Sequence, residues 1–429
     1  MGKLVFVNRY APPDNAATSQ LLGDLAFHLA ARGHRVQVVT GDQLYNDPGC
    51  KLADEEVVGG VKINRIRGTH YGRKSLAGRG VDYSSFYIGA RRLLSRTVEA
   101  GDIVIAMTDP PLLSVLAAGV AGPRGAMLFN WLQDVFPEIA IELRVPLING
   151  PVGRSLARVR DRSLRAAKFN IVLGERMREH VLHRGIDPER VVLIPNWSDD
   201  DIIVPVPHAN NPLRVEWNLC DRFVVGYSGN LGRAHEYQTL LEAAQLLKNE
   251  PEIVFLFIGD GHHISELKNQ VAVLGLSKSF QFRPYHRRAD LALSLGVADV
   301  HWLSLRPELE ALVVPSKFYG IAAAGRPAIA VTAPDGEIAR LVSRHECGVQ
   351  VSPGDSGGLA RAILELRNDL PRRERLGANA RLVSKSHFAK SASLTAWSQL
   401  LELSISEQGN GRQTAPPSVE CPVLGDPAK

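Results

Sequence analysis

A glycine-rich loop at residues 227–235 holds the first side chains suited to chemistry. It reads Tyr-Ser-Gly-Asn-Leu-Gly-Arg-Ala-His. Its glycines allow the backbone to approach a ligand closely, and Arg233 supplies a planar, permanently charged donor that matches a diphosphate. We therefore predict a phosphate-binding loop. The alternative is a simple glycine turn beside a solvated arginine.

Lys317 is a second candidate for binding an anion. Ser316 can cap a helix that runs through Ala324, which places Lys317 in the first helical turn. A cation there opposes the helix dipole, so the position costs stability unless an anion binds nearby. The sequence therefore predicts Lys317 as a phosphate ligand, with a solvated surface lysine as the alternative.

Carboxylates follow two of the expected strands. Asp134 and Glu138 follow a strand at residues 127–130, and Glu337 lies between a strand at 328–331 and a helix at 338–343. Carboxylates at the carboxyl end of a strand can hold hydroxyl-rich ligands or accept a proton. The plainer explanation for each is a charge that favours a helix N-terminus.

The loop at residues 8–19 joins the first expected strand to a helix. Ligands of open α/β sheets bind at the carboxyl ends of strands, where free N–H groups of helix N-termini favour anions. The loop has no G-x-G-x-x-G, so the dinucleotide fingerprint is absent. The alternative is an ordinary connection in which Thr18 or Ser19 caps the helix.

Short β-branched runs alternate with helical periodicity, which is typical of parallel sheets covered by helices. We predict an α/β protein with two doubly wound domains, at residues 1–197 and 214–388. A linker at 198–213 is rich in Asp, Pro and Asn. A helix at 389–405 could cross back to the first domain, and residues 406–429 read as a disordered tail. Strands are expected at residues 4–7, 36–40, 61–66, 103–107, 127–130, 170–173, 191–194, 223–227, 253–258, 280–282, 300–303 and 328–331.

Together these motifs resemble the retaining glycosyltransferases of the GT-B fold, specifically the family-4 enzymes of bacterial lipopolysaccharide and exopolysaccharide biosynthesis. The motifs that carry the resemblance are Pro12-Pro13, residues 30–36, Gln133-Asp134, Pro137-Glu138, residues 194–196, 229–233 and 257–261, Pro315-Ser316-Lys317 and residues 323–327. The resemblance implies two Rossmann-like domains that face a central cleft. It also implies that the second domain binds a UDP- or GDP-linked sugar, that the first binds the acceptor, and that transfer retains anomeric configuration without a metal or cofactor.

The resemblance assigns roles to individual residues. The catalytic group is Arg233, Lys317, Glu310 and Asp134. The donor-binding group is Gly229, Asn230, Gly232, Gly259, Asp260, Ser316 and Glu337. The acceptor side is Asn15, Ala16, Ala17 and Glu138.

The chain also departs from the family pattern. Gly320 stands where the usual ribose-binding glutamate would be, and the nearest acid to its partner position, Leu312, is Glu310. His235 stands where the loop commonly has lysine, and Ala16-Ala17 replace two glycines. We therefore hypothesise that Glu337 takes the ribose role and that Glu310 lies near the transferred sugar.

The charge of the chain suggests where the acceptor is held. Residues 1–200 carry 26 Lys and Arg against 21 Asp and Glu, so the net charge of +5 arises there. Residues 151–168 form a basic amphipathic pattern that could lie on anionic lipid, or simply be a solvated helix face. Aromatic residues make up only 6% of the chain and do not alternate with the basic ones, which disfavours nucleic-acid binding.

The resulting prediction is an enzyme that transfers a hexosyl or N-acetylhexosaminyl group to a lipid-linked saccharide. Four widely spaced cysteines fit a reducing cytoplasm, and no apolar run is long enough to span a bilayer. We expect a cytoplasmic protein, peripheral on the inner face of the plasma membrane. The alternatives are a nucleotide-sugar epimerase on the same fold and a non-catalytic GT-B scaffold.

Overall fold

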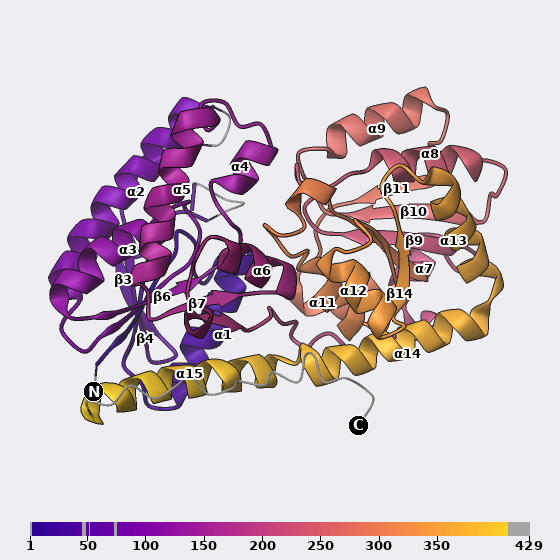
Figure 1. The fold of residues 1–429 in the computed structure, drawn as a ribbon. Coiled ribbons are helices and arrows are strands. Elements are labelled where there is room, and N and C mark those ends of the chain that lie inside the picture. The colour runs from indigo at the N-terminus through magenta and orange to yellow at the C-terminus, as the bar shows by residue number, and fades with distance from the viewer. Residues whose placement is uncertain (1, 45–48, 51, 73–74, 411–429) are drawn as a thin grey trace. The chain divides into compact units, whose positions relative to one another are not determined.

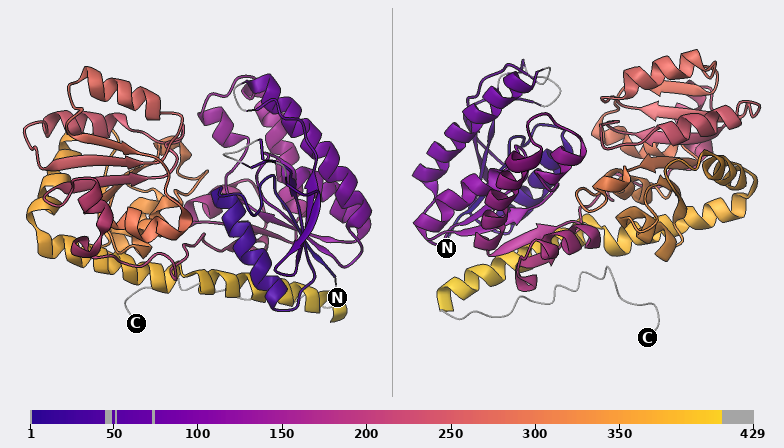
Figure 2. Two further views of the ribbon diagram at one scale, coloured as in Figure 1. Left: turned by 180° about the vertical axis from the view of Figure 1, so that it is seen from behind. Right: turned by 45° about the horizontal axis from the view of Figure 1, so that its top comes forward.

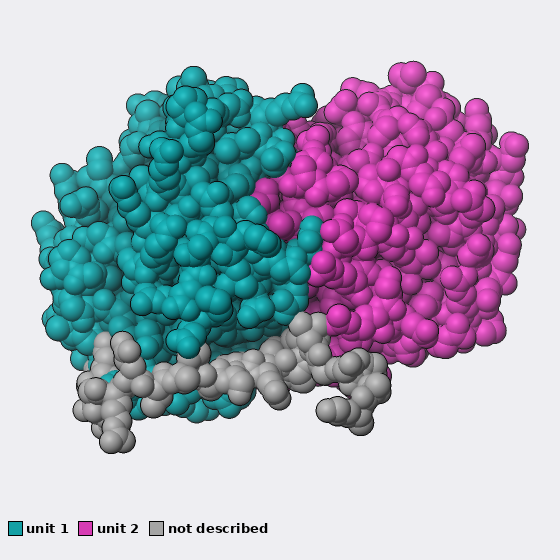
Figure 3. Space-filling view, in the orientation of Figure 1, with its two compact units in different colours: residues 1–195, 393–421 teal, residues 196–392, 422–429 magenta. Residues whose placement is uncertain are grey.

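The computed structural model describes residues 2–44, 49–50, 52–72 and 75–410. Within these residues the chain forms two compact units (Figure 3). Unit 1 comprises residues 2–195 and 393–410, and unit 2 comprises residues 196–392. The chain therefore passes from one unit to the other twice.

Unit 1 is built on a sheet with helices packed against it (Figures 1 and 2). The sheet has eight strands in the order β3-β4-β2-β1-β5-β6-β7-β8. All neighbouring strands are parallel except β3 and β4, and Leu4 lies opposite both Val36 and Ile103. Central strands such as β1 are buried throughout, as expected where helices cover both faces. The strands are β1 (Leu4–Val7), β2 (Val36–Gly41), β3 (Glu55–Val58), β4 (Val61–Ile66), β5 (Ile103–Ala106), β6 (Met127–Trp131), β7 (Phe169–Val172) and β8 (Val191–Leu193).

Strand β3 was not among the expected strands. It is an edge strand that pairs antiparallel with β4 through a turn at Gly59 and Gly60, both with positive φ. Most of its residues are exposed, so no buried run marks it in the sequence.

The helices of unit 1 cover both faces of this sheet. Phe86, Leu94 and Leu113 belong to one core cluster, which joins α2 and α3 to the central strands. Right-handed crossovers place α1 on the opposite face from α3, because β2 and β6 lie on opposite sides of the starting strands. The helices are α1 (Ala17–Ala31), α2 (Leu76–Thr97), α3 (Leu113–Ala121), α4 (Glu138–Glu142), α5 (Gly150–Ala166), α6 (Glu175–His183) and α15 (Lys390–Asn410), with 3-10 turns η1 (Gly122–Arg124) and η2 (Pro188–Arg190).

The C-terminal helix α15 packs on unit 1 (Figure 1). The ring of Trp397 is fully buried, 4.8 Å from that of Trp131. Ion pairs from Glu402 to Arg32 and from Glu407 to Lys168 fasten the rest of the helix. The expected tail at residues 406–429 was wrong at its start, because these contacts carry the helix to Asn410. Residues 411–429 lie outside the described part of the chain.

Unit 2 has a six-stranded parallel sheet in the order β11-β10-β9-β12-β13-β14. The rings of Tyr227, Phe257 and Trp302 lie together in its core. The strands are β9 (Phe223–Ser228), β10 (Ile253–Ile258), β11 (Phe280–Arg283), β12 (Val300–Ser304), β13 (Ala328–Val331) and β14 (Gly348–Val351), the last of which was not anticipated. The helices are α7 (Pro212–Glu216), α8 (Gln238–Leu246), α9 (Ile264–Val273), α10 (Leu291–Gly296), α11 (Lys317–Ala323), α12 (Glu337–Arg344), α13 (Ser356–Asn368) and α14 (Leu370–His387), with 3-10 turns η3 (His208–Asn210), η4 (Arg288–Asp290) and η5 (Pro307–Leu309).

The strand order of unit 2 reverses direction at β9. The chain moves from β9 outward to β10 and β11, then returns to β12 on the other side of β9. Ligands of open α/β sheets bind at the carboxyl ends of strands beside such a switch point. The loops after β9 and β12 are therefore the first place to look for a site.

The stretch 198–213, expected to be a linker, is an ordered part of unit 2. Asp199 accepts from Lys390 and Arg288, both at 3.1 Å, and Ile203 is buried. Asn211 caps α7 through its side chain. The polar residues that suggested a linker are helix caps and ion-pair partners.

Candidate active site

Three glycines shape the carboxyl edge of the unit 2 sheet. Gly229, Gly259 and Gly261 have φ of +129°, +131° and +147°, a region that other residues rarely adopt. A Cβ at Gly261 would lie 2.4 Å from the Leu231 nitrogen, and one at Gly259 would lie 2.4 Å from the Gly229 oxygen. The loops after β9 and β10 can therefore cross closely only with glycine at these positions.

Lys317 projects from the start of α11 over this loop. A Cβ at Gly229 would lie 2.8 Å from Lys317 Cε, so the missing side chain leaves room for the lysine. Its ammonium donates to Nε2 of His235 at 3.1 Å and lies 5.4 Å from the centre of the Tyr227 ring. Burial lowers the pKa of Lys317 to about 8. The lysine predicted as a phosphate ligand is thus held at the edge of the sheet, beside the glycine-rich loop.

His235 was noted in the sequence only as a departure from the family pattern. Its Nδ1 lies 2.7 Å from the Ser304 carbonyl oxygen at the end of β12. Burial, together with the charge of Lys317, lowers the pKa of His235 to about 3, so the ring is neutral at physiological pH. It is the structure that joins this residue to Lys317, because the two are 82 positions apart.

The remaining predicted donor residues of this edge lie in the loops after β9 and β10. Arg233 and Asn230 are exposed, and the charge of Arg233 is among the causes that lower the pKa of His263, after burial and His262. Asp260 is exposed and accepts from the Gly261 nitrogen at 2.8 Å. Gly232 is half-buried in the same loop.

Ser316 stands at the N-cap position of α11, but it does not cap the helix through its side chain. Its φ and ψ of −60° and −18° are helical, whereas a capping side chain needs an extended backbone to reach back to the first turn. The expected capping hydrogen bond was therefore wrong. The Ser316 side chain is exposed on the same edge as Lys317.

Glu310 and Glu337 lie near the N-terminus of α12. Glu310 is 2% exposed, and its carboxylate accepts from the Ala333 nitrogen at 3.1 Å. A Cβ at Gly336 would lie 2.4 Å from that carboxyl group. Glu337 is the first residue of α12, and its charge, after burial, raises the pKa of Tyr319. The positive end of the helix dipole stabilises both carboxylates.

Asp134 is an acid of unit 1 with a raised pKa. It lines a small cavity of about 20 Å³ with Thr108, Leu132 and Arg160, at the carboxyl ends of β5 and β6. Burial is the main cause that raises the pKa of Asp134 to about 6, and the nearby charge of Asp109 raises it further. A hydrogen bond with Thr108 lowers it in part. A carboxyl group that titrates near neutral pH can accept or donate a proton during a reaction.

The Glu138 carboxylate is bound by side chains of unit 1. Its carboxylate accepts from Arg160 at 2.6 Å, and Arg160 also binds Asp161 on α5. Burial raises its pKa, but the His180 ring, whose Nε2 lies 3.7 Å from the carboxylate, and the charge of Arg160 outweigh it and hold the pKa of Glu138 at about 2. Glu138 thus ties α4 to α5 in this structure.

The loop predicted on the acceptor side forms the start of α1. The helix begins at Ala17, with Ala16 as N-cap and without a side-chain cap, so neither Thr18 nor Ser19 caps it as considered. Asp14 instead accepts from the Ala16 nitrogen at 2.6 Å. Asn15 and Ala17 are exposed at the carboxyl edge of the unit 1 sheet.

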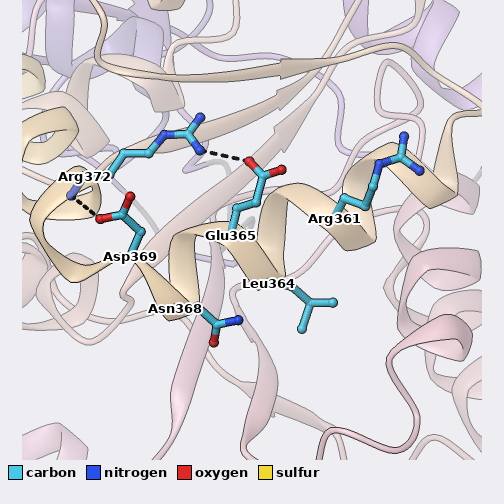
Figure 4. A pocket seen from close by; sticks show the side chains of 6 residues that line it. All are labelled: Arg361, Leu364, Glu365, Asn368, Asp369 and Arg372. Carbon is cyan, nitrogen blue, oxygen red and sulfur yellow. Dashed lines mark hydrogen bonds and ion pairs between the residues drawn. The ribbon is translucent and has the colours of Figure 1, made fainter.

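A larger pocket, of about 410 Å³, lies between α13 and α14 (Figure 4). Three of its charged residues pair with one another: the Arg372 side chain binds Glu365 at 2.9 Å, and the Arg372 backbone nitrogen donates to Asp369. The end of α13 lies at the amino ends of the strands, where Arg367 pairs with Glu250 just before β10. The pocket therefore lies away from the edge that carries the site.

Neither a metal cluster nor a membrane span is evident in the described ranges. Within residues 2–44, 49–50, 52–72 and 75–410, no three His, Cys, Asp or Glu side chains gather as metal ligands. The helices in this part of the chain are too short or too polar to cross a bilayer.

Two doubly wound units, one with cations beside a glycine-rich loop, define the GT-B class of glycosyltransferases. Solved structures of this class share the fold: that of HepE from Anabaena in complex with UDP superposes with a TM-score of 0.70, over 94% of this chain and all of that chain, at 17% identity.

Sequence comparison identifies the family within that class. Residues 18–197 match the "Glycosyl transferase 4-like domain", and residues 213–383 match "Glycosyl transferases group 1". The probable glycosyltransferase WbjE of Pseudomonas aeruginosa is 30% identical over 73% of this chain and 78% of its own length. The putative colanic acid biosynthesis glycosyl transferase WcaI of Escherichia coli is 24% identical over 79% of this chain and 85% of its own.

The chain belongs to this family of glycosyltransferases, in the group of lipopolysaccharide and exopolysaccharide biosynthesis. The predicted fold, family and enzyme class are confirmed. The family favours a transferase over the epimerase and the non-catalytic scaffold.

Proposed function

We propose that this protein transfers a hexosyl or N-acetylhexosaminyl group from a nucleoside diphosphate sugar to a lipid-linked saccharide, with retention at the anomeric carbon. Unit 2 binds the donor and unit 1 the acceptor. UDP is the first nucleotide to test, because HepE was crystallised with UDP and with UDP-glucose.

The position of Lys317 carries this proposal. Its ammonium faces a neutral imidazole and an aromatic ring, and none of the carboxylates in the described ranges pairs with it. A partly buried cation with neutral neighbours attracts an anion strongly, since nothing cancels its field. With exposed Arg233 on the same edge, Lys317 would stabilise the negative charge on the departing diphosphate. Such stabilisation needs no divalent ion.

The test is to incubate the purified protein with radiolabelled UDP- and GDP-sugars, with and without bacterial membrane lipids. Transfer of label to lipid, unchanged by EDTA, supports the proposal. Conversion of the free donor without transfer would indicate an epimerase. Transfer only to water-soluble saccharides would contradict the lipid-linked acceptor, and the anomeric configuration of the product, determined by NMR, decides between retention and inversion.

The hypothesis for the two glutamates predicts different kinetic effects. We expect Glu337→Gln to raise the donor KM about tenfold, because one charged partner of the ribose hydroxyls is weakened. We expect Glu310→Gln to lower kcat more than it changes KM, because its carboxylate would act near the transferred sugar. Asp335→Asn is the control, because Asp335 is an exposed acid two residues before Glu337 and has no role in the hypothesis. Wild-type kinetics in both glutamate variants would reject the assignment.

Helix α5 provides the surface for the proposed membrane contact. Leu164 is buried against the unit, while Arg154, Arg158 and Arg162 are exposed. Basic residues of this kind bind anionic lipid at about 1 kcal/mol each near the surface. Arg165 is also exposed, but it donates to the Arg184 carbonyl oxygen, so it is left intact in the test.

We expect replacement of the three exposed arginines by Gln to release the protein from vesicles containing phosphatidylglycerol, as added salt would. Vesicle cosedimentation measures this. The control replaces Arg344, Arg375 and Lys385, three exposed cations of unit 2, and so changes the net charge equally. Equal release of both triple variants would show that net charge, and not α5, controls vesicle binding. Release of neither variant would show that α5 is only a solvated helix face.

A further inference from the structure

His235 links the end of β12 to Lys317 by two hydrogen bonds. Its Nδ1 lies 2.7 Å from the Ser304 carbonyl oxygen, which can only accept, so Nδ1 carries the proton. Its Nε2 lies 3.1 Å from the Lys317 ammonium, which can only donate, so Nε2 offers its lone pair. These two partners favour the neutral tautomer protonated at Nδ1, and the Asn230 carbonyl oxygen is a further acceptor beside the ring.

This tautomer has a consequence for the charge of the site. A carboxylate in the place of His235 would also hold the ammonium, but it would cancel the positive charge. A neutral acceptor fixes the position of the ammonium and leaves its charge available to an anion. The Tyr227 ring, whose centre lies 5.4 Å from Lys317 Nζ, is equally neutral.

The backbone around His235 keeps the imidazole in place. The Arg306 nitrogen donates to the Ala234 carbonyl oxygen at 3.0 Å, and the Glu236 nitrogen donates to Ser304 Oγ at 3.2 Å. The residues on both sides of His235 are thus tied to the end of β12. A histidine held at its ring and at both neighbours is well suited to fix the position of a flexible lysine.

We propose that His235 is a positioning residue that holds the Lys317 ammonium, still charged, where it binds the diphosphate of the donor. The proposal rests on the proposed function, because it takes a nucleoside diphosphate as the ligand. His235 does not itself transfer a proton: its part is to accept one hydrogen bond from Lys317 and to remain neutral.

Three single variants separate positioning from packing. His235→Gln keeps a neutral acceptor, His235→Leu removes the acceptor at similar bulk, and His235→Glu adds an acceptor that cancels the charge. We expect UDP affinity, measured by titration calorimetry, to fall about threefold for Gln, about tenfold for Leu and most for Glu. The matched control is His301→Leu, because His301 is another buried neutral histidine bonded to a backbone carbonyl, that of Leu295. It should lower the melting temperature and leave UDP affinity unchanged.

A transposed lysine gives an independent test. Since the ammonium lies within hydrogen-bond distance of the His235 ring, a lysine at position 235 can deliver its charge to the same place. We expect His235→Lys combined with Lys317→Met to bind UDP at least fivefold more tightly than Lys317→Met alone.

The outcomes distinguish this inference from the proposed function. Suppose that the wild-type protein binds UDP or GDP. The role of His235 would then be overturned if His235→Leu bound the nucleotide as tightly as the wild type does. It would also be overturned if His235→Gln and His235→Glu bound it equally well. No gain from the transposed lysine would overturn it as well. If the wild-type protein binds neither nucleotide, the proposed function fails and the inference fails with it.

Discussion

Lys317→Met is expected to lower kcat/KM for the donor by about 10²–10³-fold while the protein stays folded. Removal of one preorganised donor to developing negative charge has an effect of this size. The ammonium of Lys317 faces neutral groups, and none of the described carboxylates pairs with it, so the variant removes a charge that is not cancelled by its neighbours. Steady-state kinetics with the donor found in the radiolabel assay measure the effect.

Lys268→Met is the matched control for this variant. Lys268 lies on the same unit, is exposed, and stacks over Phe282 at 5.2 Å, so the change in chemistry is identical. Its kinetics should stay within twofold of wild type. A similar loss in both variants would mean that a general change in charge, and not the position of Lys317, controls the rate.

The pH dependence of Lys317 gives a second readout. Burial lowers its pKa to about 8, so the uncharged amine accumulates above that pH and donor affinity of the wild-type protein should fall. Lys317→Arg keeps its charge throughout this range, so the fall should move to higher pH. An identical pH profile for Lys317→Arg and the wild type would show that another group titrates.

Gly261→Ala is expected to abolish UDP binding and to destabilise the protein by about 2–4 kcal/mol. The φ of +147° is strained for alanine, and the new Cβ would meet the Leu231 backbone at 2.4 Å. Relief requires the loops after β9 and β10 to separate, which displaces the residues of the glycine-rich loop. Calorimetric titration and thermal unfolding measure the two effects.

Gly275→Ala separates the clash from the backbone strain. Gly275 also has a positive φ, +68°, but a Cβ there would meet only the end of the Lys248 side chain at 3.8 Å. We expect a cost of about 1–2 kcal/mol and normal UDP affinity. Retention of UDP binding by Gly261→Ala would show that the loop crossing is unrelated to the donor site.

Most strands of the two sheets could be predicted because a buried parallel strand leaves a mark in a few consecutive residues. The strands of both sheets are short β-branched runs between helical periods, and parallel strands buried on both faces produce such runs. The edge strand β3 has mostly exposed residues, so the same signal is missing. The prediction of a linker at 198–213 was wrong for a related reason. Asp199 forms an ion pair with Lys390 and Asn211 caps α7, and polar composition alone does not distinguish such residues from those of a loop.

Some features of the candidate site could likewise be predicted from the sequence, and others could not. The sequence by itself determined the fold class, the glycine-rich loop and the cation at Lys317, because glycine tolerance and charge are properties of single residues. Only the tertiary structure decided that the Glu138 carboxylate is held by Arg160, that α15 returns to unit 1, and that His235 holds Lys317. The last pair spans 82 positions, and the pairing of β12 beside β9 in the sheet brings its members within hydrogen-bond distance. Hydrogen bonds and burial depend on that proximity in space, which no local pattern encodes.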